Sequence, residues 1–192
     1  MKISFHGATQ TVTGSKHLIT LSNGKKILLD CGMFQGLGPD TTKMNNHFGF
    51  NPAEVDYMVL SHAHVDHSGL IPKLVKEGFK GKIFTTSATK DLTEILLKDS
   101  AHIQANDVKF INKRRFLEGK QPIEPLYTIE HVNEALHRFV EVPYEKPFTI
   151  DEDITLQLFE NGHILGACTI FLSIKENGKI TKIAFSGDVG RY

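Results

Sequence analysis

The sequence predicts an α/β domain in which helices pack on a mixed β-sheet. Three observations support this: a β-hairpin near the N-terminus, alternating strand and helix patterns in the middle, and further strands towards the end. Alternating strands and helices favour parallel neighbours, whereas a hairpin requires antiparallel ones. A chain of 192 residues is long enough for one domain with its own hydrophobic core.

The hairpin is predicted from two apolar-rich runs, His17–Leu21 and Lys26–Asp30, which flank an Asn-Gly pair. A tight hairpin turn needs residues that tolerate a positive φ, and Asn-Gly is the strongest short signal for it. Ile3–His6 indicates a short strand before the hairpin. Pro39–Asn51 is polar and rich in glycine and asparagine, which indicates a loop.

The middle of the chain alternates between the two patterns. Asp56–Leu60 is predicted to be a buried strand, and Gly69–Glu77 carries apolar residues at helical spacing. A second strand, Lys82–Thr86, and a second helix, Thr89–Asn106, follow. This order predicts that the strands lie in one sheet with helices on its face.

The segment Asp107–Pro147 is harder to assign, and Glu130–Phe139 is its best candidate helix. We expect Phe110 and Phe116 to be core residues. The first part of this segment is basic, and a solvated helix face explains it as well as contact with phosphates does. Its cations are Lys109, Lys113, Arg114, Arg115 and Lys120.

The last part of the chain predicts three strands, Ile154–Phe159, Cys168–Lys175 and Lys182–Ser186. A Gly-Asp-Val-Gly turn follows the third strand, and no element after it covers that edge. We therefore expect residues 1–192 to be the N-terminal part of a longer protein.

Composition sets further limits. Lys+Arg and Asp+Glu number 22 each, so a nucleic-acid function would need a local basic surface. Two cysteines, Cys31 and Cys168, are too few for a disulfide framework and indicate a reducing compartment. The N-terminus lacks a long apolar segment, so we expect no signal peptide or membrane span and a cytoplasmic location.

The most informative stretch is Ser61–His67, which has the pattern His-x-His-x-Asp-His at a strand–helix junction. His62 and His64 are two residues apart and can face the same way from an extended segment. Asp66 and His67 follow as the chain turns, and can face a second ion. Three imidazoles and a carboxylate suit zinc, or less often iron or manganese.

Two more ligands and one supporting carboxylate are predicted from their positions. His163 and Asp188 both follow strands and are flanked by glycines, which allow tight turns and close approach to an ion. Asp188 could bridge two ions with its two carboxylate oxygens. Asp30 ends an apolar strand, and we expect it to accept the N–H of a ligating imidazole rather than bind metal itself.

These motifs resemble the metallo-β-lactamase superfamily and, within it, the β-CASP RNA nucleases. That group includes the nuclease subunit of the cleavage and polyadenylation machinery. Asp30 matches the first motif, His62–His67 the second, His163 the third and Asp188 the fourth. The Gly7–Ser15 opening and the Asp99–Gln104 and Phe185–Arg191 segments resemble the nucleases rather than lactamases.

The resemblance implies an αββα sandwich, of which this chain supplies the first half or somewhat more. It implies one zinc held by His62, His64, His163 and Asp188, and a second held by Asp66, His67 and Asp188 with a further C-terminal histidine. Past residue 192 we expect the inserted β-CASP domain and the C-terminal lactamase half. The isolated chain should therefore bind its second metal weakly and cleave RNA slowly.

The leading hypothesis is a zinc-dependent ribonuclease that hydrolyses RNA phosphodiester bonds, with Asp66 orienting the nucleophile and accepting its proton. An alternative is a small-molecule hydrolase of esters, thioesters or lactones, which would use the same ligands. A catalytically inactive binding subunit is a third hypothesis, against which the complete set of expected ligands argues. The sequence does not determine the oligomeric state, and a homodimer is one alternative.

Overall fold

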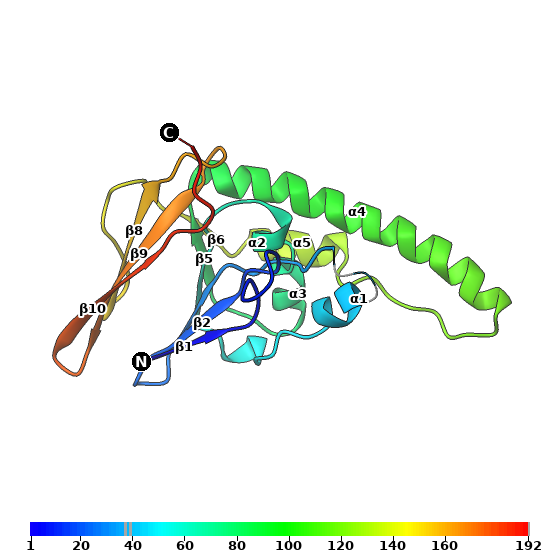
Figure 1. Cartoon of the computed structure of the whole chain (residues 1–192), viewed down its shortest axis with the longest axis horizontal. Helices are drawn as coiled ribbons and strands as arrows, with labels where there is room; N and C mark the ends of the chain where they lie inside the picture. Colours follow the sequence, from blue (N-terminus) through cyan, green and yellow to red (C-terminus); the bar gives the residue numbers. More distant parts are fainter. Residues whose placement is uncertain (37, 39, 192) are drawn as a thin grey trace.

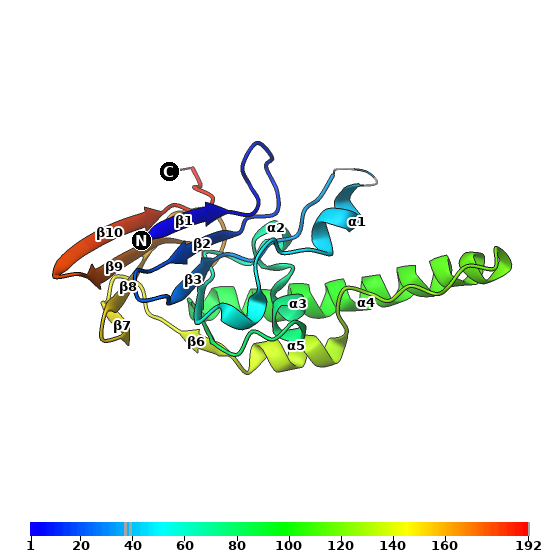
Figure 2. The same ribbon diagram turned by 90° about the horizontal axis from the view of Figure 1, so that it is seen from below.

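The computed structural model describes residues 1–36, 38 and 40–191 (Figure 1). Two β-sheets lie face to face, and helices cover the outer face of the larger sheet (Figure 1, Figure 2). This gives three successive layers of the predicted αββα sandwich: helices, a six-stranded sheet and a four-stranded sheet. Among the described residues, no helix packs on the outer face of the four-stranded sheet, where Phe171 is exposed.

The six-stranded sheet has the order β1-β2-β3-β4-β5-β6, and the four-stranded sheet has the order β10-β9-β8-β7. Pairing is antiparallel from β1 to β3, parallel from β3 to β6, and antiparallel throughout the smaller sheet. The strands are β1 Lys2–Phe5, β2 His17–Thr20, β3 Lys26–Leu29, β4 Tyr57–Val59, β5 Lys82–Thr85, β6 Phe139–Glu141, β7 Phe148–Asp151, β8 Ile154–Glu160, β9 Cys168–Glu176 and β10 Lys179–Phe185. The helices are α1 Asp40–Asn45, the 3₁₀ turn η1 Pro52–Glu54, α2 Val65–Ser68, α3 Ile71–Lys76, α4 Ser87–Leu117 and α5 Ile129–Leu136.

The hydrophobic core has two parts, one on each face of the larger sheet. The inner part fills the space between the sheets, where Ile27 and Val59 from the larger sheet pack with Leu156 and Ile170 from the smaller one. The outer part lies under α3, α4 and α5. Successive residues of β3 and β4 point alternately into the inner and the outer part of the core, as the period of two along a strand requires.

Most predicted strands are confirmed, but three predictions were wrong. Residues 40–45 form helix α1 within the stretch predicted as a loop, while Pro39 lies outside the described residues. The helix predicted to end at Asn106 continues to Leu117. Phe110 and Phe116, expected in the core, lie on this extension with 75% and 83% of their surface exposed.

The topology brings two sets of loops to one rim of the sandwich. The parallel strands β3, β4 and β5 end at the same edge of the larger sheet, where Asp30, Ser61 and Thr86 follow them. In the smaller sheet, β8 and β10 also end at one edge, because both run antiparallel to β9. The Cys168 N–H donates to the Ser61 carbonyl (2.9 Å) and joins the two edges. Four predicted metal ligands lie in the loops at this rim, and the other two, Asp66 and His67, lie in the short helix α2.

Candidate metal centre

Four predicted ligands converge at the rim from both sheets. His62 and His64 follow β4, His163 follows β8, and Asp188 follows β10. One ligand atom from each of the four lies within 4.8 Å of those from the others. His64 Nδ1 is 3.1 Å from both His62 Nε2 and His163 Nε2, so the three imidazoles surround one point.

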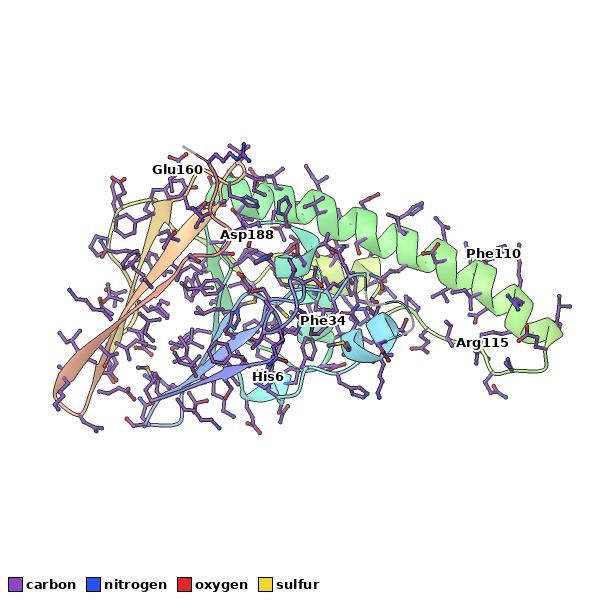
Figure 3. All side chains as sticks on the ribbon, in the orientation of Figure 1. His6, Phe34, Phe110, Arg115, Glu160 and Asp188 are labelled. Carbon is purple, nitrogen blue, oxygen red and sulfur yellow. The ribbon has the colours of Figure 1, made fainter. Side chains whose placement is uncertain are left out.

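Asp188 completes this first group and also faces a second. Its Oδ2 is 3.6 Å from His163 Nε2 and 4.0 Å from His62 Nε2. Its Oδ1 is 3.4 Å from His67 Nε2, which in turn is 3.8 Å from Asp66 Oδ2. The two oxygens of one carboxylate therefore face two ligand groups, and Figure 3 shows Asp188 at this rim.

The donor chemistry and spacing fit divalent metal. Ligand atoms around a tetrahedral ion at ~2.1 Å lie about 3.4 Å apart, and the four separations given above for the first group, from 3.1 to 4.0 Å, bracket that value. Imidazole nitrogens and carboxylate oxygens are the ligands that zinc and related ions take. The second group offers three protein ligands, Asp66, His67 and Asp188, at a more open position.

Asp30 lies beneath the second group and is fully buried. Its Oδ2 accepts a hydrogen bond from His67 Nδ1 at 2.7 Å, which leaves Nε2 of that ring directed at Asp188 and Asp66. The same carboxylate accepts from the Ser61 N–H (2.8 Å), from the Ser61 hydroxyl (3.0 Å) and from the Ser15 hydroxyl (3.2 Å). Asp30 thus orients His67 and is itself fixed by two serines.

The two serines are the functional residues that the sequence analysis missed. Ser15 and Ser61 each contribute a hydroxyl to the buried Asp30 carboxylate. Ser61 adjoins the histidine motif and Ser15 ends the glycine-containing opening segment. A buried carboxylate must be hydrogen-bonded, so the prediction for Asp30 implied such donors without identifying them.

Burial and neighbouring charges separate the pKa values of two histidines. Burial, followed by the charge on His67, lowers the pKa of His62 to about 4. Burial also acts to lower the pKa of His67, but the hydrogen bond that its Nδ1–H donates to Asp30 and the nearby carboxylates outweigh burial and raise that pKa. At neutral pH His62 is therefore neutral, with a free lone pair for a metal ion.

These shifts predict how the stability of the metal-free protein depends on pH. The folded-state pKa of His62 lies below the ordinary histidine value of 6.5, so the stability that this residue contributes is lost as pH falls from 6.5 towards 4. The loss should be roughly 1–3 kcal/mol. The folded-state pKa of His67 lies above 6.5. The stability that His67 contributes is therefore present below pH 6.5 and is lost as pH rises through the raised pKa.

Urea unfolding in EDTA across this range should therefore show maximal stability near pH 6.5. His67→Gln should flatten the decline on the alkaline side. It should also make the acid-side decline shallower, because it removes the second cause of the low pKa of His62. A free energy of unfolding that stays constant between pH 4 and 6.5 would contradict the assignment for His62.

The backbone of the Val65–His67 segment is held by neighbouring loops. The Ser15 N–H donates to the Asp66 carbonyl, and the Cys31 N–H to the His67 carbonyl. Gly32 lies so close that a Cβ on it would be 1.5 Å from the Asp66 carbonyl oxygen. The ligand segment therefore has a tight backbone support that only glycine permits.

We expect Gly32→Ala to displace Asp66 and His67 and to destabilise the protein by about 1–3 kcal/mol. Metal affinity at the second position should fall, which metal titration would measure. Gly178→Ala is the control, because its site has a positive φ of 73° but no atom within 4 Å of an added Cβ. It should cost only about 1–2 kcal/mol of backbone strain and leave metal binding unchanged.

The loop that carries His163 is fixed from two sides. Thr86 and Thr89, at the start of α4, both donate their hydroxyls to the Gly166 carbonyl at 2.8 Å. On the other side, the Gly190 N–H donates to the Asn161 carbonyl (3.1 Å), so the His163 and Asp188 loops support each other. The loops that carry His163 and Asp188 are thus held in place by hydrogen bonds within the protein.

Comparison with known proteins places these features in a wider group. Residues 14–192 match the family model described as the metallo-beta-lactamase superfamily. A ribonuclease of Thermus thermophilus is 35% identical over 192 residues, which are 99% of this chain and 38% of the relative. An endoribonuclease of Candida albicans is 31% identical over 186 residues, which are 96% of this chain and 20% of the relative.

A transcription termination factor of Thermococcus kodakarensis is 31% identical over 183 residues, which are 91% of this chain and 26% of the relative. The chain therefore spans well under half the length of these relatives. Among solved structures, a metallo-β-lactamase of Cronobacter sakazakii matches with a TM-score of 0.55 at 17% identity, over 96% of this chain and 55% of that one. A metallo-β-lactamase of Legionella gormanii matches with a TM-score of 0.55 at 17% identity, over 99% of this chain and 62% of that one.

Proposed function

Because the chain belongs to the metallo-β-lactamase superfamily, we propose that it carries the metal centre of a zinc-dependent ribonuclease that hydrolyses RNA phosphodiester bonds. The observation that carries the proposal is Asp188, whose two oxygens face two separate groups of ligands. The names of the relatives, which include a ribonuclease and an endoribonuclease, support RNA as the substrate. They also agree with the resemblance to the β-CASP nucleases.

Each site residue has a role in this proposal. His62, His64, His163 and Asp188 would hold one zinc, and Asp66, His67 and Asp188 would hold the other. Zinc bound there would supply an acidified water and would neutralise charge that builds on the phosphate oxygens. Asp66, whose side chain is 20% exposed, orients the attacking water and accepts its proton. Asp30 keeps the His67 ring in its ligating orientation.

We also propose that the whole protein includes an inserted β-CASP domain and a C-terminal lactamase half, which complete the second metal position and supply the acid for the leaving oxygen. The lengths of the relatives support this. Both cysteines are free and buried, which supports a reducing, cytoplasmic location. No helix in the described part of the chain is both long and apolar enough to cross a membrane.

A cleavage assay tests the function. Residues 1–192 loaded with zinc should cleave labelled single-stranded RNA slowly, and EDTA or His62→Ala should abolish the cleavage. Attack by water does not use the RNA 2′-hydroxyl, so the products should carry no 2′,3′-cyclic phosphate. If the zinc protein hydrolyses esters, thioesters or lactones while RNA stays intact, the small-molecule hydrolase hypothesis replaces this one.

A further inference from the structure

The outer half of α4 extends beyond the rest of the molecule (Figure 1, Figure 2). The buried residues of this helix end at Ala101, and residues 107–117, which we call the α4 tip, have none. Phe110, Phe116 and Leu117 on the tip are largely exposed. Figure 3 shows Phe110 and Arg115 on this free part of the helix. Large apolar side chains left in water in this way indicate a surface that binds something.

The α4 tip is also basic, although the formal net charge of the whole chain is zero. It carries Lys109, Lys113, Arg114 and Arg115 against a single acid, Asp107. Arg114 pairs with Glu118 just beyond the tip, at 2.9 Å. Lys109 and Lys113 form no ion pair with any residue that the structure describes, so both are available to a negatively charged partner.

The cations and the rings share one side of the helix. At 100° per residue, Lys109, Lys113, Phe110 and Phe116 fall within an arc of about 120°. Lys109, Lys113 and Phe116 also line one shallow open groove. Ammonium groups next to exposed aromatic faces are the combination that binds phosphates and stacks on bases of single strands.

The tip is held in shape by the chain that returns along it. Asn112 donates its side-chain amide to the Ile123 carbonyl and accepts the Ile123 N–H, both at 2.9 Å. The Arg115 Nε–H donates to the Gln121 carbonyl at 2.6 Å. The lysines and rings are therefore presented by a braced helix rather than by a free end.

We propose that the α4 tip is a binding surface for single-stranded RNA, in which Lys109 and Lys113 contact phosphates and Phe110 and Phe116 stack on bases. The proposal rests on the proposed ribonuclease function and adds a substrate contact outside the metal centre. The tip is about 35 Å along α4 from the end that holds the His163 loop. An RNA bound at both places would have to span that distance.

Charge and geometry favour RNA over two other occupants. A membrane-surface helix separates its apolar and cationic residues onto opposite faces, whereas here they are interleaved. A second copy of the tip would bring like charges together. The experiment below distinguishes binding to a membrane and self-association from binding to RNA.

Binding is measured by fluorescence anisotropy with a labelled single-stranded RNA of about 20 nucleotides, in EDTA so that no cleavage occurs. Lys109→Glu/Lys113→Glu should weaken binding about ten-fold or more and reduce the slope of log affinity against log salt by about 1.4, which is the value for two lost phosphate contacts. Phe110→Ala/Phe116→Ala should weaken binding at least about ten-fold and leave the salt slope unchanged.

Matched variants control for charge and for exposed apolar area. Lys179→Glu/Lys182→Glu makes the same charge change on exposed residues of β10, and Ile95→Ala/Ile180→Ala removes two side chains exposed by 65% and 66%. Both controls should bind RNA nearly as the unaltered protein does. Circular dichroism checks that every variant is folded.

The proposal is overturned if the tip variants bind RNA like their controls. It is also overturned if they lose only binding to phosphatidylserine vesicles, or only self-association in sedimentation equilibrium. Cleavage by the unaltered zinc protein is a separate measurement. Tip-dependent RNA binding without any zinc-dependent cleavage would count against the ribonuclease function, and cleavage with tip-independent binding would count against the tip alone.

Discussion

Asp188→Ala is expected to remove metal from both positions and to lower hydrolytic activity at least about 1000-fold. Each oxygen of this carboxylate faces a different ligand group, with Oδ2 at 3.6 Å from His163 Nε2 and Oδ1 at 3.4 Å from His67 Nε2. The side chain is 47% exposed, so its loss should leave the fold intact. The effect should therefore appear in metal content and activity and hardly in the free energy of unfolding.

Metal analysis after dialysis would measure this, with two variants for comparison. His67→Ala should reduce metal mainly at the second position. Glu160→Ala removes an exposed carboxylate at the end of β8 and should leave metal content unchanged. An Asp188→Ala protein that retains full metal content would show that this residue is not shared between the two groups.

Asp30→Ala is expected to destabilise the metal-free protein by about 3–5 kcal/mol, because it removes one partner of a buried ion pair. His67 Nδ1 and the Ser61 N–H would lose their acceptor, and the hydroxyls of Ser15 and Ser61 would lose their hydrogen bonds to the carboxylate. A buried donor without a partner costs its full desolvation penalty. Alanine would also be strained at the φ of 58° that Asp30 adopts.

Asp30→Asn separates these causes. Asparagine tolerates a positive φ and retains an acceptor oxygen, but it lacks the charge that raises the pKa of His67. It should be destabilised less than Asp30→Ala, and its stability should no longer decline as pH rises above 6.5. Glu152→Ala, at an exposed carboxylate, is the control for urea unfolding. Equal stability of Asp30→Ala and this control would refute the supporting role of Asp30.

Most residues of the candidate metal centre could be proposed from the sequence because the information is local. Four of the six proposed ligands lie within His62–His67, directly after an apolar strand. His163 and Asp188 are recognisable by the strands before them and the glycines around them. The serine donors to Asp30 could not be found in this way, because a hydroxyl hydrogen bond across 31 residues leaves no pattern in the sequence.

The fold elements that sequence analysis missed have few buried residues. The outer half of α4 buries no side chain beyond Ala101, so no apolar period marks its continuation to Leu117. Strands β6 and β7 lie at sheet edges and have only three and four residues, too few for a clear alternation. Short edge strands are fixed by their neighbours in the sheet rather than by their own sequence.

The division of the metal ligands between the two sheets also constrains when the centre can form. His62 and Asp188 are separated by more than half of the chain, and they meet only when the smaller sheet has docked on the larger one. A nascent chain that ends before β10 therefore lacks a ligand of both groups. Metal that needs ligands from both sheets favours the assembled sandwich by mass action, by about 2.7 kcal/mol when free metal is 100-fold above its dissociation constant. Metal uptake during refolding would accordingly report the docking of the sheets and not the formation of either sheet alone.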